Sequence, residues 1–91
     1  MKYNQTTLDK IEKIVEESGY VLRYERGTFQ SGYCILEDKK VVVLNKFLNI
    51  EGRINTLIDL LPSIKLTYEF LTVDSQKMYD EVMGQQVPAK K

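Results

Sequence analysis

Residues 41–61 read VVVLNKFLNIEGRINTLIDLL, a stretch that passes from a strand pattern to a helix pattern within a few residues. Val41–Leu44 is apolar on both faces of a strand, which is typical of a central strand covered on both sides or covered by a partner chain. Asn49 is a favoured helix N-cap, and Pro62 ends the helix that follows. This helix has one apolar stripe, formed by Ile50, Ile54, Leu57, Ile58 and Leu61.

Two further strands precede this stretch. The alternation from Tyr20 to Arg26 and the apolar run within Gly32–Glu37 predict them, and Lys40–Phe47 is the third strand. Only short breaks separate the three strands, and parallel neighbours need long crossover connections. We therefore predict a three-stranded antiparallel meander.

A helix is predicted on the N-terminal side of these strands. Thr6 and Asp9 have the spacing of a capping box, and Gly19 supplies the left-handed residue that ends many helices. Apolar residues between them recur at helical spacing and would form one buried face. They are Leu8, Ile11, Ile14 and Val15.

On the C-terminal side, residues 64–70 alternate apolar and polar side chains, which suits either a fourth strand or an extended segment on the surface. A last helix is predicted from Asp74 or Ser75 to Met83, closed by Gly84, and residues 85–91 are predicted to be a flexible tail. The whole pattern predicts one α+β domain over residues 1–84, with its helices packed on one face of the sheet.

The composition narrows the classes of function. The chain has 91 residues, with 13 Lys and Arg against 13 Asp and Glu, one Cys and no His. Zero net charge argues against a polyanion-binding protein that works by bulk electrostatics. One Cys cannot form an intrachain disulfide, and the N-terminal residues lack the apolar segment of a signal peptide. We therefore expect a soluble cytoplasmic protein without a membrane-spanning segment.

The absence of His removes the commonest general base and the commonest transition-metal ligand. Cys34 is interpreted as a small buried apolar residue in a strand, because no imidazole exists to activate its thiol. We therefore expect a non-enzymatic protein without catalytic, cofactor-binding or metal-binding residues. Adjacent carboxylates point to different sides of a helix or lie in a turn, as in Glu16/Glu17, Asp80/Glu81 and Glu37/Asp38.

Aromatic and Arg side chains interleave between residues 20 and 33. Such side chains are enriched in protein interfaces, and a small sheet with one exposed apolar face is commonly covered by a second copy. The leading prediction is therefore association with another protein, first of all as a homodimer. The predicted contact residues are Tyr20, Arg23, Tyr24, Arg26, Phe29 and Tyr33.

Two further hypotheses belong to other functional classes. Aromatic residues on a sheet, flanked by Arg, can stack single-stranded bases, which predicts nucleic-acid binding with a steep salt dependence. A hydrolase with an unrecognised carboxylate site would instead cluster Asp and Glu in a pocket and raise their pKa values.

The stretch Val41–Leu61 resembles the core of the zinc-dependent anti-repressor peptidases, in which a strand ending in Asn precedes a helix reading R-x-F-T-L-A-H-E-L-x-H. Asp59, Leu60 and Ser63 stand where the first zinc-binding His, the catalytic Glu and the second His belong. The resemblance therefore implies a catalytically inactive relative that keeps only the scaffold. The matched positions of the motif are Arg53, Thr56, Leu57 and Leu61.

The whole chain also resembles a family of small uncharacterised bacterial proteins, through the stretch SGYCILEDKKVVVLNKF at residues 31–47. That family has no known activity, so this second resemblance implies no site residues.

Overall fold

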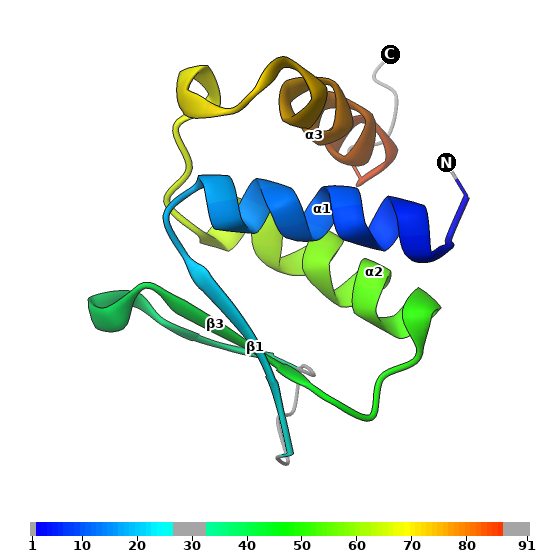
Figure 1. Cartoon of the computed structure of the whole chain (residues 1–91), viewed down its shortest axis with the longest axis vertical. Coiled ribbons are helices and arrows are strands. Elements are labelled where there is room, and N and C mark those ends of the chain that lie inside the picture. The colour runs from blue at the N-terminus through cyan, green and yellow to red at the C-terminus, as the bar shows by residue number, and fades with distance from the viewer. Residues whose placement is uncertain (1, 27–32, 87–91) are drawn as a thin grey trace.

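The computed structural model of the chain describes residues 2–26 and 33–86, and it confirms the predicted α+β class (Figure 1). Within these residues three helices and three strands are joined in part by short 3-10 turns. In chain order the elements are α1 (Gln5–Glu17), β1 (Val21–Glu25), β2 (Tyr33–Leu36), η1 (Glu37–Lys39), β3 (Val41–Asn45), α2 (Ile50–Leu60), η2 (Leu61–Ser63), η3 (Tyr68–Phe70) and α3 (Val73–Gln86).

The sheet is mixed, so the predicted antiparallel meander is wrong. Its strand order is β1-β3-β2, in which β1 runs parallel to the central β3 and β2 runs antiparallel to β3 on the other side. Parallel strands do need a long connection, and here β2 and η1 are part of the chain between β1 and β3. Short breaks between consecutive strands do not reveal that the second strand lies beyond the third. The central position of β3 agrees with its continuous apolar run.

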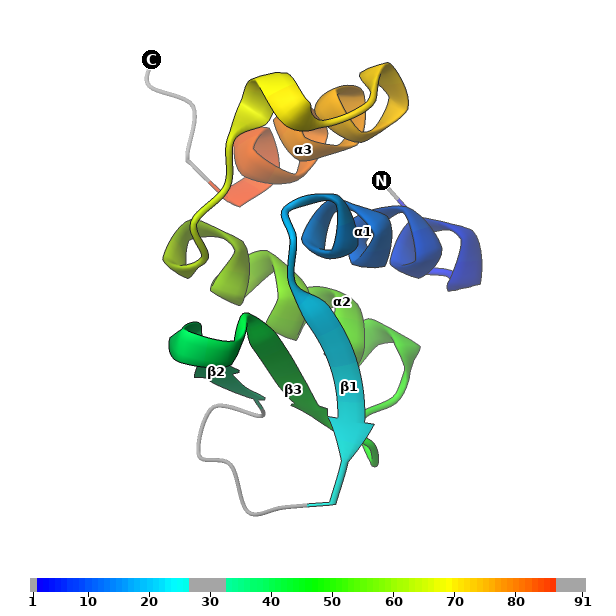
Figure 2. The ribbon, with the colours of Figure 1, turned by 60° about the vertical axis from the view of Figure 1, so that its left-hand side comes forward.

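All three helices lie on one side of the sheet, in two layers (Figures 1 and 2). α1 and α2 cover the sheet, whereas α3 packs on α1 and α2 and lies on the far side of α1 from the strands. The core fills the space between these layers. Its most deeply buried side chains are Leu8, Ile11, Ile14, Val15, Val42, Leu44, Ile54, Leu57, Leu60, Leu61 and Val82.

Local hydrogen bonds set the helix ends. The side chain of Asn4 caps α1 by accepting a hydrogen bond from the N–H of Thr7 at 2.9 Å, so the capping box predicted at Thr6 is wrong. Asn49 caps α2 as predicted, because its side chain accepts the backbone N–H three residues later at 2.7 Å. Gly19 follows α1 with a φ of +91°, the left-handed conformation expected of it.

The segment after α2 is the extended surface segment rather than a strand. Residues 64–67 pair with no strand in the described parts of the chain, and Tyr68–Phe70 forms a 3-10 turn. The alternating pattern is nevertheless real, because Ile64 is buried and Leu66 is half-buried, whereas Lys65 and Thr67 are exposed. A period of two therefore indicates an extended chain, with or without a pairing partner.

α3 begins at Val73 and continues to Gln86, so Gly84 lies inside the helix and does not close it as predicted. Of the predicted tail, residues 87–91 lie outside the described residues. Throughout residues 2–26 and 33–86, no helix combines the length and the apolar character needed to cross a membrane.

Candidate functional site

Tyr20, the first of the predicted contact residues, is a core residue. It is 3% exposed and lies just before β1. Its hydroxyl donates a hydrogen bond to Oε1 of Glu37 at 2.8 Å and accepts one from the N–H of Lys65 at 3.0 Å. The ammonium of Lys40 lies 4.9 Å from the centroid of its ring. Tyr20 therefore holds separate segments of the chain together, and its assignment to an exposed contact surface is corrected.

Tyr24 and Tyr33 also face the helices. Both are half-buried and pack against the core. The hydroxyl of Tyr24 donates a hydrogen bond to Glu12 on α1, and the guanidinium of Arg53 on α2 lies 4.4 Å from the centroid of its ring. Arg53 is itself held by two backbone carbonyls that precede α2. Tyr24 therefore fastens α1 and α2 to the sheet, which is a structural role.

The other predicted contact residues are dispersed. Arg23 is exposed on β1, where its guanidinium forms an ion pair with Glu25 at 2.8 Å. Arg26 is exposed directly after β1, with its guanidinium 5.9 Å from the ring centroid of Phe47. Phe29 lies outside the described residues. The described members of the predicted set do not form one surface, because alternate residues of β1 face opposite sides of the sheet.

A different set of residues forms the side of the sheet that faces away from the helices, which we name the outer sheet face. The strand register places three apolar side chains in one row across it, with Val21 of β1 beside Val41 of β3 and Val41 beside Leu36 of β2. Val21 is 56% exposed and Leu36 is 43% exposed, and none of the described helices covers this side (Figure 1). The complete outer sheet face consists of Val21, Arg23, Glu25, Cys34, Leu36, Val41, Val43 and Asn45. It is not uniformly exposed, because Val43 in the central strand is buried.

Cys34 is half-buried on this face, in register with Val43. Over the described ranges, no group of three or more His, Cys, Asp or Glu side chains is placed to hold a metal ion. In the segment that resembles the zinc peptidases, Leu60 is fully buried and Asp59 is exposed. The relation to that family therefore rests on the sequence resemblance.

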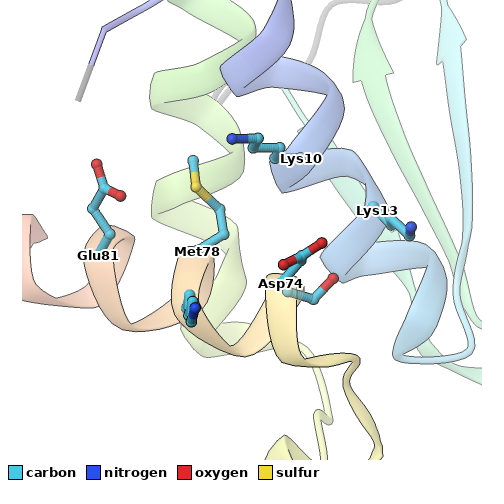
Figure 3. A pocket seen from close by; sticks show the side chains of 7 residues that line it. Lys10, Lys13, Asp74, Met78 and Glu81 are labelled. Carbon is cyan, nitrogen blue, oxygen red and sulfur yellow. The ribbon is translucent and has the colours of Figure 1, made fainter.

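A cleft of about 320 Å³ lies between α1 and α3 (Figure 3). Met78 on α3 gives it an apolar wall, and ionised side chains of both signs surround it. The cleft therefore has a lining of mixed charge. Its charged residues are Lys10, Lys13, Asp74, Lys77 and Glu81.

Comparison of the chain with protein-family models, with curated protein sequences and with solved protein structures finds no match. The two resemblances seen in the sequence therefore stay predictions, and the function is inferred from the surfaces of the chain itself.

Proposed function

We propose that this chain is a non-enzymatic protein that acts by association, and that its partner is a second copy bound across the outer sheet face. The observation that supports this proposal best is the apolar row of Val21, Val41 and Leu36, in which Val21 and Leu36 are exposed and Val41 is half-buried. The solvated face of a small sheet normally carries polar side chains opposite the apolar ones that enter the core. Contiguous exposed apolar side chains are instead typical of a surface that binds another protein.

The charged residues of the outer sheet face are compatible with its burial under a partner, because they form an ion pair with each other. Its ionised side chains are Arg23 and Glu25, which pair with each other on the edge strand β1. Covering the face would therefore bury no unpaired charge, and the pair can remain at the rim in contact with water. Because the face has no excess charge, it favours a neutral apolar partner over an acidic or basic one. An identical face meets that requirement.

A two-fold axis parallel to the strands brings apolar rows together. Such an axis reverses the order of strands across the interface but keeps each residue at the same height along the strands. β3 then lies over β3 of the second copy, and β1 lies over β2. Val41 therefore meets Val41 of the second copy, and Val21 meets Leu36. The contact is closed and self-complementary, as expected of a homodimer.

The outer sheet face is small, which limits the affinity. Strands about 4.8 Å apart that rise about 3.4 Å per residue give three strands of up to five residues a flat area of roughly 14 Å by 17 Å. Stable interfaces of standard size bury about 800 Å² on each partner. We therefore expect a reversible dimer that is populated at tens of micromolar and dissociates on dilution.

Sedimentation equilibrium of the wild type and two matched variants tests the proposal. Val21→Lys places a charge in the apolar row at a position that is 56% exposed. Val73→Lys makes the same change at a position that is 65% exposed, at the start of α3 and away from the sheet. We expect the wild type and V73K to dimerise and V21K to stay monomeric, with all three equally helical by circular dichroism.

Two results would overturn the proposal. One is a wild-type chain that stays monomeric from tens of micromolar up to its solubility limit. The other is a pair of lysine variants that sediment alike, because the outer sheet face would then make no special contribution to association.

A further inference from the structure

A second exposed surface lies where the parallel strands β1 and β3 stop together. The N–H of Lys46 donates a hydrogen bond to the carbonyl of Glu25 at 3.0 Å, which holds the end of β1 beside the turn that leads into α2. Phe47 is 69% exposed in that turn. The guanidinium of Arg26 and the ammonium of Lys46 each lie 5.9 Å from the centroid of its ring. We name Arg26, Lys46 and Phe47 the strand-end cluster.

Phe47 is not needed in the core, and its position is nevertheless fixed. Its N–H donates a hydrogen bond to Oδ1 of Asn45 at 2.9 Å, so an ordered turn holds the ring out in solvent. In the part of the chain that the structure describes, a cation also lies near the rings of Tyr20 and Tyr24. Those two rings are buried or half-buried, whereas the ring of Phe47 is accessible to a ligand.

We propose that the strand-end cluster binds single-stranded nucleic acid, with one base stacked on Phe47 and the flanking phosphates paired with Arg26 and Lys46. An exposed ring with two cations near it complements a polyanion whose bases carry flat faces. A purely acidic partner would use the cations but would gain nothing from a ring held in water. Proteins that bind single strands combine these two kinds of contact.

The energies favour replacing a cation by a base on the ring. A base stacked on an aromatic side chain generally contributes more to binding than a cation beside an exposed aromatic ring. Arg26 and Lys46 have long flexible stems, so each can turn from the ring towards a phosphate when a base occupies its place. Two phosphate contacts give a slope of about −1.4 for the logarithm of the binding constant against the logarithm of salt concentration. This slope is modest, in keeping with zero net charge.

Fluorescence anisotropy of a labelled mixed-sequence oligonucleotide at low salt tests the site, using the full chain and matched variants. Phe47→Ala should weaken binding about tenfold, which corresponds to about 1.4 kcal/mol of stacking. Phe70→Ala removes another exposed ring, 80% exposed and far along the chain, and should leave binding unchanged. Lys46→Gln should lower the salt slope by about 0.7, whereas Lys77→Gln in the α1–α3 cleft should not change it.

Three results would overturn this inference. They are absence of oligonucleotide binding at low salt, equal losses in F47A and F70A, and displacement of the oligonucleotide by polyglutamate at equal charge concentration, which would indicate a simple acidic ligand. The inference is independent of dimer formation, because the strand-end cluster shares no residue with the outer sheet face. V21K should therefore bind the oligonucleotide as the wild type does.

Discussion

The N–H of Lys65 donates a hydrogen bond of 3.0 Å to the phenol oxygen of Tyr20, which stands 45 positions earlier in the chain. The same oxygen donates to Glu37 at 2.8 Å. One buried hydroxyl therefore connects the junction of α1 and β1, the turn between β2 and β3, and the segment after α2. Tyr20 therefore gives all three segments a common attachment.

Tyr20→Phe should destabilise the fold. The change keeps the ring in the core but leaves the N–H of Lys65 without its partner, and such a loss costs about 1–3 kcal/mol. For a domain of this size each kcal/mol lowers the melting temperature by about 4–8 °C. Thermal unfolding followed by circular dichroism measures the effect. Tyr3→Phe, at a position 37% exposed, is the control and should melt with the wild type. Equal melting temperatures for all three chains would contradict this role.

High pH should also destabilise the fold. Burial raises the pKa of Tyr20 and Glu37 adds to the rise, although the N–H of Lys65 opposes it. Burial and the hydrogen bond to Glu12 likewise raise the pKa of Tyr24. Below the ordinary tyrosine pKa of about 10 both states are neutral, so the full stability is present. Above it the unfolded chain loses protons first, so stability falls as pH rises towards the pKa values of the folded chain.

Urea denaturation on both sides of the ordinary tyrosine pKa measures this effect. The free energy of unfolding of the wild type should decline with rising pH, and the decline should be smaller in a chain that carries both Tyr20→Phe and Tyr24→Phe. A decline of the same size in that double variant would show that other groups cause the loss.

The sequence predicts those parts of the fold that depend on near neighbours. The stripe from Leu8 to Val15, the cap at Asn49 and the turn at Gly19 follow from residues a few positions apart, and the structure contains all three. The strand order depends instead on which strands pair with each other, and the paired strands can be far apart in the chain. Leu22 lies beside Val42 because β1 pairs with β3 rather than with β2, its neighbour along the chain, and no local spacing encodes that choice.

The candidate surfaces are predicted less well from the sequence. Residue type alone favours the aromatic side chains as contact residues, whereas position on the strand decides which side of the sheet each one faces. Tyr20 and Tyr24 are each two residues from Leu22, and residues two apart on an extended chain face the same side, which here is the side of the core. Val21 is next to Leu22 in the strand and therefore faces the opposite side of the sheet. An apolar residue at that position indicates the outer sheet face. Phe47 lies two residues after the end of β3, where the strand alternation no longer decides which side a residue faces, and its ring is exposed.

Acid should weaken the attachment of α3 to α1. A carboxylate oxygen of Glu17 accepts a hydrogen bond from the N–H of Thr72 at 2.9 Å, and the Thr72 hydroxyl donates to the same carboxylate at 3.1 Å. Burial alone would raise the pKa of Glu17, but the hydrogen bonds from Thr72 and Ser75 and the charge of Lys13 outweigh it and lower that pKa. A lowered pKa means that this stability is present above the ordinary glutamate pKa and is lost as pH falls through the pKa of the folded chain.

Glu17→Gln should therefore cost about 1 kcal/mol at neutral pH, since water screens a half-exposed carboxylate. The difference from the wild type should shrink as pH falls below about 4, the ordinary range for glutamate. Urea denaturation at several pH values measures it, and the exposed neighbour Glu16→Gln is the matched control. A difference that persists unchanged in acid would mean that the charge of Glu17 is unimportant.

Two glycines should respond in opposite ways to the same substitution. Gly19 has a φ of +91°, and a Cβ built there meets no atom within 4 Å, so Gly19→Ala should cost about 1–2 kcal/mol through backbone strain alone. Gly84 lies inside α3 with equally open surroundings, so Gly84→Ala should stabilise the chain by up to about 1 kcal/mol. The denaturant midpoints of the two variants should therefore move in opposite directions from the wild type. If both variants become more stable, the residue after α1 does not need the left-handed conformation. If both become less stable, α3 does not extend past residue 84.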